Sequence, residues 1–297
     1  MPTRTCLPLA LLAAGTAAAS DPVAELKRRQ AEAFAAESAA QSYAATVTQV
    51  PLRQPNRPAP RPKVTELRVG RRPGHVLIQT GDKLTALNPR YGFVLKRQGD
   101  GWVVVRRAAG GGSDPARFKY EELFGTSEAM AARPLTAFTS LESFADALAA
   151  DGLTAEAVAP PTDYRVRYPT PAADGKAYER VVQCRYAAGG PALLSAVRQS
   201  TSAPTVDYRF TRDLDPAGRA TKVEEVVVQR GKDEPMQTLR CEFRDYQPTA
   251  PPEAEFYLAH YGLPEPDGPA GGAGRWWLVP VVGLLAAAGW LVLRRRR

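Results

Sequence analysis

Apolar residues alternate with polar ones over most of the central chain, and this two-residue period constrains the fold more than any other feature. The alternation begins at Lys63, and turn signals at 73–74, 81–82, 88–89 and 100–101 divide it into short segments. Side chains two positions apart lie on the same face of a β-strand, so each segment predicts a strand with one apolar and one wet face. A meander of short antiparallel strands follows from this pattern. Its inward-facing residues are Leu67, Val69, Val76, Ile78, Tyr91, Phe93, Leu95, Val103 and Val105.

Helical patterns precede the strands and interrupt them. Asp21-Pro22 is a typical helix start, and apolar residues up to Val47 are spaced for a helix that runs to about Thr46. Residues 110–113 break the strand pattern, residues 114–152 have helical spacing, and alternation resumes at Asp163. We expect an α+β fold in which one antiparallel sheet packs its apolar face against helices. Two small domains joined at residues 110–113 are the alternative.

The first residues are typical of an export signal. A short segment with Arg4 precedes an apolar run from Cys6 to Ala14, and Ala17-Ala18-Ala19 fits the cleavage rule of signal peptides. The sequence therefore predicts a signal peptide over residues 1–19 and a folded body over residues 20–266 outside the cytoplasm.

The C-terminal end has the pattern of one membrane-spanning helix. Residues 276–293 carry no charge over 18 positions, about 27 Å of helix against a hydrocarbon core of ~30 Å. Aromatic rings favour the membrane–water interface, and cations next to a membrane span stay on its cytoplasmic side. After a Gly/Pro-rich linker over 267–275, we expect a single-pass anchor in the cell membrane with a cytoplasmic tail at 294–297. The predicted membrane-interface residues are Trp276, Trp277, Arg294, Arg295, Arg296 and Arg297.

Pro264-Glu265-Pro266 ahead of this segment, followed by the arginine cluster, resembles bacterial C-terminal sorting signals of the PEP type. In that family a membrane enzyme removes the anchor. The Pro-Glu-Pro lies farther ahead of the span here than in the family, so we expect the anchor to be retained, with processing as the alternative.

The formal net charge of +8 does not indicate a nucleic-acid partner. Arg4 and the four C-terminal arginines contribute five of these charges, and subtracting five from eight leaves +3 on the folded body. The remaining basic residues alternate with acidic ones along the strands, without a dense basic stripe and interleaved aromatics. We expect no nucleic-acid binding.

No catalytic constellation stands out. His75 and His260 are the only histidines, and neither has a metal-ligand partner at helical or hairpin spacing. Neighbouring carboxylates such as Glu224-Glu225 point apart on a strand. Ser113 follows three glycines but lacks the Lys-Ser/Thr of a phosphate-binding loop. We expect no catalytic residue, no metal, no cofactor and no enzymatic activity.

Cys184 and Cys241 are the cysteines that remain after signal removal. Outside the cytoplasm a disulfide is permitted, and a loop of about 57 residues would stabilise the fold by ~4 kcal/mol in the chain-entropy model. Two buried free thiols are the alternative.

An aromatic stripe follows the second set of strands and has two interpretations. It could line a pocket for an apolar ligand, or it could be the core beneath the central helices. Its candidate ligand-lining residues are Tyr164, Val166, Tyr168, Tyr208, Phe210 and Phe243.

The order of strands, helical insert and further strands resembles the LolA/LppX-like half-barrel family of bacterial envelope proteins. Residues 87–95 and 255–266 are similar to stretches in exported proteins that end in an anchor. The resemblance implies a curved sheet whose concave face holds acyl chains or is filled by helices. We therefore expect a non-enzymatic, membrane-anchored envelope protein that binds a lipid, lipoprotein or other apolar partner. The alternative is a structural or protein-interaction domain whose core is plugged by helices.

Overall fold

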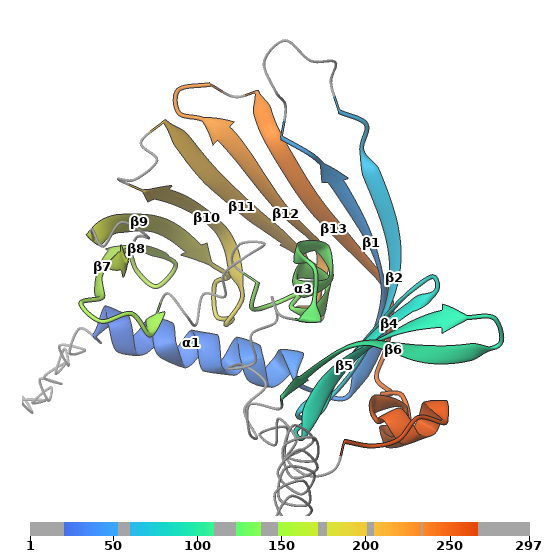
Figure 1. The fold of residues 1–297 in the computed structure, drawn as a ribbon. Helices are drawn as coiled ribbons and strands as arrows, with labels where there is room; N and C mark the ends of the chain where they lie inside the picture. The colour runs from blue at the N-terminus through green and yellow to red at the C-terminus, as the bar shows by residue number, and fades with distance from the viewer. Residues whose placement is uncertain are drawn as a thin grey trace, which may run out of the picture.

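One antiparallel sheet of thirteen strands contains most of the described residues (Figure 1). The computed structural model describes residues 21–52, 60–109, 123–137, 148–171, 177–200, 205–232 and 234–266. The strands are β1 (Gln41–Val50), β2 (Lys63–Arg72), β3 (His75–Thr80), β4 (Lys83–Leu87), β5 (Tyr91–Gln98), β6 (Gly101–Ala109), β7 (Thr154–Ala159), β8 (Asp163–Pro171), β9 (Ala177–Tyr186), β10 (Leu193–Ser200), β11 (Val206–Leu214), β12 (Ala220–Gln229) and β13 (Pro235–Gln247).

Two meanders meet in the middle of this sheet. Strands β1 to β6 follow one another outward on one side, and β13 back to β7 follow one another on the other side. The meanders join where β1 pairs with β13 in an antiparallel register that matches Val47 with Cys241. The first and last strands of the described chain therefore hold the two halves of the sheet together.

The expected α+β fold class is wrong, because the molecule is mostly β. Within the described residues there are two α-helices, α1 (Pro22–Glu37) and the seven-residue α3 (Thr126–Ala132). Two short 3₁₀ helices, η2 (Glu253–Phe256) and η3 (Leu258–Tyr261), follow the last strand. Among the described residues, the helices that contribute to the core on the apolar face of the sheet are α1 and the short α3.

Helix α1 ends at Glu37, nine residues before the expected boundary near Thr46. Residues 41–50 form β1 instead, with Tyr43, Ala45 and Val47 buried at alternate positions. Tyr43 and Val47 are four residues apart, a spacing that fits both one face of a helix and one face of a strand. β-Branched residues in this stretch favour the strand.

Helix α1 packs against the β7 end of the sheet and buries Leu26, Ala33 and the side chain of Arg29. Asp21 caps it, with its carboxylate accepting from the Val23 N–H at 3.0 Å. The buried Arg29 guanidinium donates to the carbonyls of Gly190 at 2.7 Å and Pro161 at 3.1 Å, and lies 5.2 Å from the ring centroid of Tyr186. The helix therefore closes the concave side beside β7 to β10 (Figure 1).

The expectation of a C-terminal transmembrane helix, and with it a membrane partner and single-pass localisation, is corrected. No helix in the described part of the chain is long and apolar enough to span a membrane. Helix α1 has 16 residues and several charges, and α3 spans only about 10 Å at 1.5 Å per residue. Residues 1–19, the linker 267–275, Trp276, Trp277 and the arginines 294–297 lie outside the described residues.

Over β3 to β5 the sheet carries buried apolar side chains on both faces. A large core lies on the concave face and includes residues from α1, α3 and strands across the whole sheet. A second, smaller core lies on the convex face of β3 to β5, where η2 and η3 cover it with Phe256 and Leu258. We call residues 248–263, which fold back over the convex face, the C-terminal cap.

Candidate functional site

The predicted ligand-lining residues lie on the concave face. Five of them belong to its core, and none of these five is more than 6% exposed. Tyr208 is half-buried, with the Arg198 guanidinium 4.2 Å from its ring centroid. The five core residues are Tyr164, Val166, Tyr168, Phe210 and Phe243.

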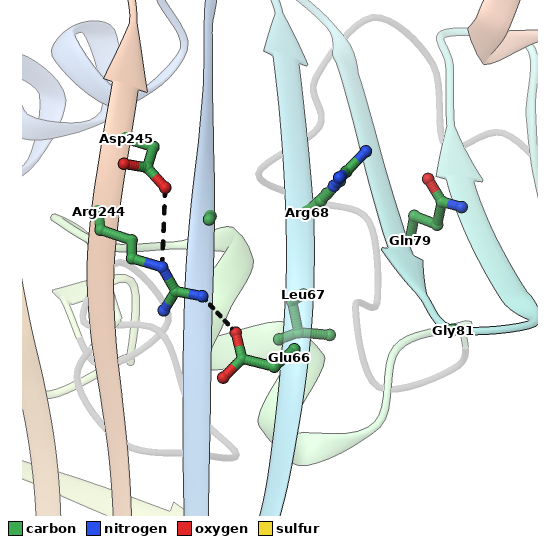
Figure 2. A pocket seen from close by; sticks show the side chains of 8 residues that line it. Glu66, Leu67, Arg68, Gln79, Gly81, Arg244 and Asp245 are labelled. Atoms are coloured by element: carbon green, nitrogen blue, oxygen red, sulfur yellow. Dashed lines mark hydrogen bonds and ion pairs between the residues drawn. The ribbon is translucent and has the colours of Figure 1, made fainter.

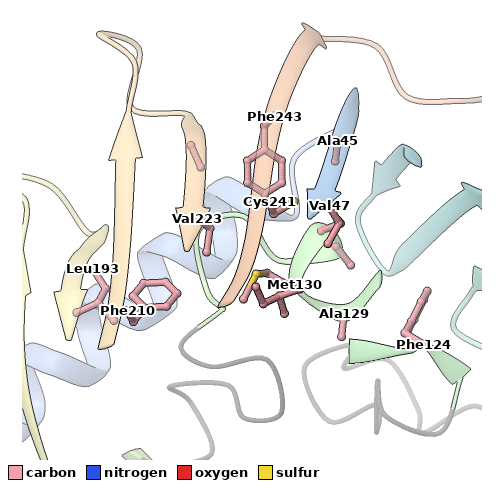
Figure 3. Packing of buried hydrophobic residues seen from close by; sticks show 14 of the residues in the cluster. Ala45, Val47, Phe124, Ala129, Met130, Leu193, Phe210, Val223, Cys241 and Phe243 are labelled. Atoms are coloured by element: carbon pink, nitrogen blue, oxygen red, sulfur yellow. The ribbon is translucent and has the colours of Figure 1, made fainter. Parts of the chain in front are cut away.

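Helix α3 and the residues after it occupy the middle of this concave face. We call residues 126–137 the plug. Met130 is fully buried in the same core as Cys241, Phe243 and Val223 (Figure 3), and α3 contacts β1, β13, β2 and β3. The alanines of the plug at 129, 131, 132 and 137 are at most 1% exposed. Small side chains let the backbone of the plug approach the sheet closely.

Side chains from three strands hold the main-chain carbonyls of the plug. Tyr43 on β1 donates its hydroxyl hydrogen to the Ala131 carbonyl at 2.9 Å. Arg71 on β2 donates to the Ala132 carbonyl. Arg212 on β11 donates to the carbonyls of Pro134 and Ala137, both at 2.7 Å. Buried carbonyls of an irregular segment need side-chain donors of this kind, because they have no partner strand whose N–H groups could bind them.

Glu37, the last residue of α1, binds the plug from the other side. Its carboxylate accepts from the Leu135 N–H at 2.9 Å and from the Thr136 hydroxyl. It also forms an ion pair with Arg71 at 3.5 Å, in which neither side chain is more than 2% exposed. We call Tyr43, Glu37, Arg71 and Arg212 the latch.

The Glu37 carboxylate offsets part of the positive charge that Arg71 and Arg212 bring into the core. Burial lowers the pKa of Arg212 to about 10, while the nearby Glu37 carboxylate opposes that change. Arg212 therefore stays charged near neutral pH. Charged donors make stronger hydrogen bonds than neutral ones, so the latch fixes the plug in one arrangement.

The sequence contains a signal for the latch that pattern reading missed. Arg71 and Arg212 stand at inward positions of their strands, two residues after Val69 and Phe210, and Glu37 follows Ala33 by four on the buried face of α1. A charge at an inward position requires a buried partner.

The two cysteines do not form the disulfide. Both thiols are free and buried, and Cys184 on β9 is four strands away from Cys241 on β13. Strands lie about 4.8 Å apart, so the Cα atoms are separated by roughly 19 Å, while a disulfide needs less than about 7 Å. Burial raises the pKa of Cys184 to about 12 and raises that of Cys241 still further.

Neither histidine enters a catalytic arrangement in the described structure. His75 lies under the cap, with Nδ1 2.8 Å from the Pro73 carbonyl and Nε2 3.3 Å from the Tyr257 hydroxyl. His260 stacks edge-on against Tyr261. Within the described residues, no group of three His, Cys, Asp or Glu side chains could hold a metal ion.

The convex face has an open hollow where the concave face is filled (Figure 2). It lies over β13, β1, β2 and β3 and has a volume of about 570 Å³. A second hollow of about 350 Å³ adjoins it and shares Ala44, Arg68, Gln79 and Asp245. Pro251 and Glu255 of the C-terminal cap line that second hollow. We call the two together the outer hollow.

One row of paired residues forms the floor of the outer hollow. Ala44 lies opposite Arg244 on one side and Arg68 on the other, and Arg68 lies opposite Gln79. Arg244 donates to the Glu66 carboxylate at 2.5 Å and to the Thr46 hydroxyl, and this hydrogen bond lowers the pKa of Glu66. Ala44 leaves space between two guanidinium groups.

A bulge places Asp245 in the outer hollow. The register between β1 and β13 shifts at Ser42 and Ala44, so that Asp245 and Tyr246 together oppose Tyr43. Asp245 has a φ of 58°, the one non-glycine residue of the described chain with positive φ. Without the bulge, the residue after Arg244 would point to the concave face. The bulge therefore adds a carboxylate next to Arg244, at 3.7 Å.

Comparison with known proteins does not assign a family. No protein-family model matches the chain, and no curated protein matches it. A crystal structure of a DUF1329 family protein from Desulfovibrio piger is similar, with 12% sequence identity and a TM-score of 0.43 over 82% of this chain and all of that one. An identity this low says nothing about activity. The large curved antiparallel sheet is the feature that this chain has in common with the expected half-barrel architecture.

Proposed function

We propose that this chain is a non-catalytic binding protein, a half-barrel of the LolA/LppX-like kind whose interior is filled by its own plug. Its ligand site is then the outer hollow. The observation that carries this proposal is the latch, because Tyr43, Arg71, Arg212 and Glu37 bind the main chain of the plug from three strands and a helix. A removable lid needs weaker attachment than this.

Apolar side chains of the plug cover the middle of the concave face in the described part of the chain. Met130 and its neighbouring alanines already occupy the place where an acyl chain would lie. Displacing them would remove the hydrogen bonds that Arg71, Arg212 and Glu37 make with the plug, at a cost of about 1–3 kcal/mol for each buried group left unsatisfied. This supports a filled interior over a lipid-holding one.

The absence of an activated group in the outer hollow supports a binding role. Arg68, Gln79, Arg244, Glu66 and Asp245 offer charge and hydrogen bonds. The hollow lacks a nucleophile with an adjacent base within the described residues, which is the arrangement that covalent catalysis needs. Recognition is the chemistry that these residues support.

Native mass spectrometry of the full chain tests the proposal. We expect a protein purified from a membrane-containing lysate to have the mass of the polypeptide alone. A co-purified lipid at one per chain would contradict the filled interior and favour a lipid-binding half-barrel. Arg212→Ala supplies the comparison, because it loosens the plug and should increase binding of an apolar dye, while Arg240→Ala on the convex face should not.

A further inference from the structure

The charges of the outer hollow are only partly matched by one another. The Arg244 side chain is bound to Glu66 and Thr46, whereas the Arg68 side chain makes no hydrogen bond or ion pair with any described residue. Asp245 lies 3.7 Å from Arg244 and its side chain is 73% exposed. Glu255 adds a second carboxylate at the cap. Arg68 is therefore available to an anionic group of a ligand, and the exposed carboxylate of Asp245, with Glu255 nearby, is available to a cationic group.

We infer that the outer hollow binds a small zwitterion, with its carboxylate on Arg68 and its ammonium group on Asp245. This inference rests on the proposed function and specifies its ligand class. The planar guanidinium of Arg68 presents a fork of N–H donors that matches a carboxylate. The Gln79 amide, opposite Arg68 in the row, lies beside the same end of the ligand.

The conformation of Asp245 is the second, independent observation. A left-handed backbone at a non-glycine residue costs free energy and persists where the surroundings require it. β-Bulges are frequent beside binding sites because they turn a side chain to a new direction. Here the bulge directs a carboxylate into the outer hollow, and Glu255 reinforces its preference for a cation.

The spacing of the two groups fits a short molecule. Arg68 on β2 and Asp245 on β13 are two strands apart, about 10 Å between backbones. The Arg68 side chain points toward Gln79 in Figure 2, and a rotation of this long, flexible side chain brings its guanidinium toward Asp245. A dipeptide spans about 7 Å at 3.3–3.6 Å per residue. A ligand with charge of one sign only would meet a like charge at one end of the hollow, which disfavours it.

Isothermal titration of the full chain with L-alanyl-L-alanine tests the inference. We expect saturable binding that weakens at least ten-fold when the dipeptide is N-acetylated or C-amidated. Arg68→Ala should weaken binding of the free dipeptide ten-fold and leave that of the amide unchanged. Asp245→Asn keeps the backbone conformation. It should weaken binding of the free dipeptide ten-fold and leave the binding of the N-acetylated dipeptide unchanged.

Two variants serve as controls. Arg240→Ala removes another convex-face arginine, paired with Glu224, and Asp100→Asn removes an exposed turn carboxylate, and neither should change the affinity. Equal binding of free and blocked dipeptides would overturn the inference, and so would binding that Arg68→Ala and Asp245→Asn leave unaltered or no binding at all. None of these outcomes changes the result expected from native mass spectrometry, which tests separately whether the interior is filled by the plug.

Discussion

The two faces of the central strands β13, β1 and β2 use charge in opposite ways. On the concave face, Arg71 is buried and bound to the plug and to Glu37. On the convex face of the same strand, the Arg68 side chain is exposed and makes no hydrogen bond or ion pair with any described residue. A buried charge with fixed partners keeps the fold in one arrangement, whereas an exposed charge without a partner is available to a ligand. The comparison separates the structural face from the face that we propose for binding.

Removal of a latch charge should have the largest effect. Arg212→Ala leaves the carbonyls of Pro134, Ala137 and Leu193 without a donor, and breaking a buried charged network costs about 3–5 kcal/mol. We expect a loss of unfolding free energy of that size in chemical denaturation. The matched Arg240→Ala on the convex face should change it by less than about 0.5 kcal/mol. If both variants lowered the unfolding free energy equally, the concave and convex arginines would not differ in their contribution to stability.

The next largest effect is expected where the C-terminal cap touches the sheet. A Cβ added to Gly70 would lie 2.3 Å from the Pro251 ring, so Gly70→Ala must push the cap off the convex face. Overpacking of this kind costs about 1–3 kcal/mol. Thermal unfolding measures it, with Gly101→Ala as control, because nothing lies closer than 4.0 Å to a Cβ there. An unchanged melting temperature for Gly70→Ala would show that the cap is not seated there.

A substitution at the bulge should stabilise the protein while removing ligand binding. Asp245→Gly relieves a left-handed conformation that costs an L-residue roughly 1–2 kcal/mol, so we expect a gain of about 1 kcal/mol in unfolding free energy. Asp245→Ala keeps the strain and should give no gain. If Asp245→Gly destabilises the fold, the carboxylate is needed for the structure and not for a ligand.

The smallest effect concerns the thiols of the concave core. Burial raises the pKa of Cys184 to about 12, so both thiols should be unreactive toward a disulfide reagent at pH 8 and should react once denatured. In the unfolded state the cysteine pKa is about 8.5, so the folded state holds the thiol proton more tightly. The stabilisation that this provides is lost as the pH rises from about 9 toward 12. If Cys184 and Cys241 did not react in the denatured protein either, a disulfide between them would be indicated.

Sequence alone predicted most strands of both meanders, but not β1, β4 or β7. It also placed Val103 and Val105 of β6 on the inward face, where the structure leaves them 40% and 62% exposed. It did not predict the pairing of β1 with β13, because partners so distant along the chain leave no local signal. It placed residues 41–46 in a helix, since a spacing of four fits either element. Arg71, Arg212 and Glu37 were predictable as buried charges from their inward positions, but their partners in the plug were not. The bulge at Asp245 depends on register and has no marker in the sequence.

Amide hydrogen exchange of the plug is the most direct test of the filled interior. The N–H groups of Ala129, Arg133, Leu135 and Ala137 are all hydrogen-bonded, the third of them to Glu37. If the plug is part of the core, these amides should exchange only through global unfolding, with the same protection free energy as the amides shared by β1 and β13. Exchange of the plug amides several orders of magnitude faster than those of β1 and β13 would show that the plug opens on its own and that the concave face is a site.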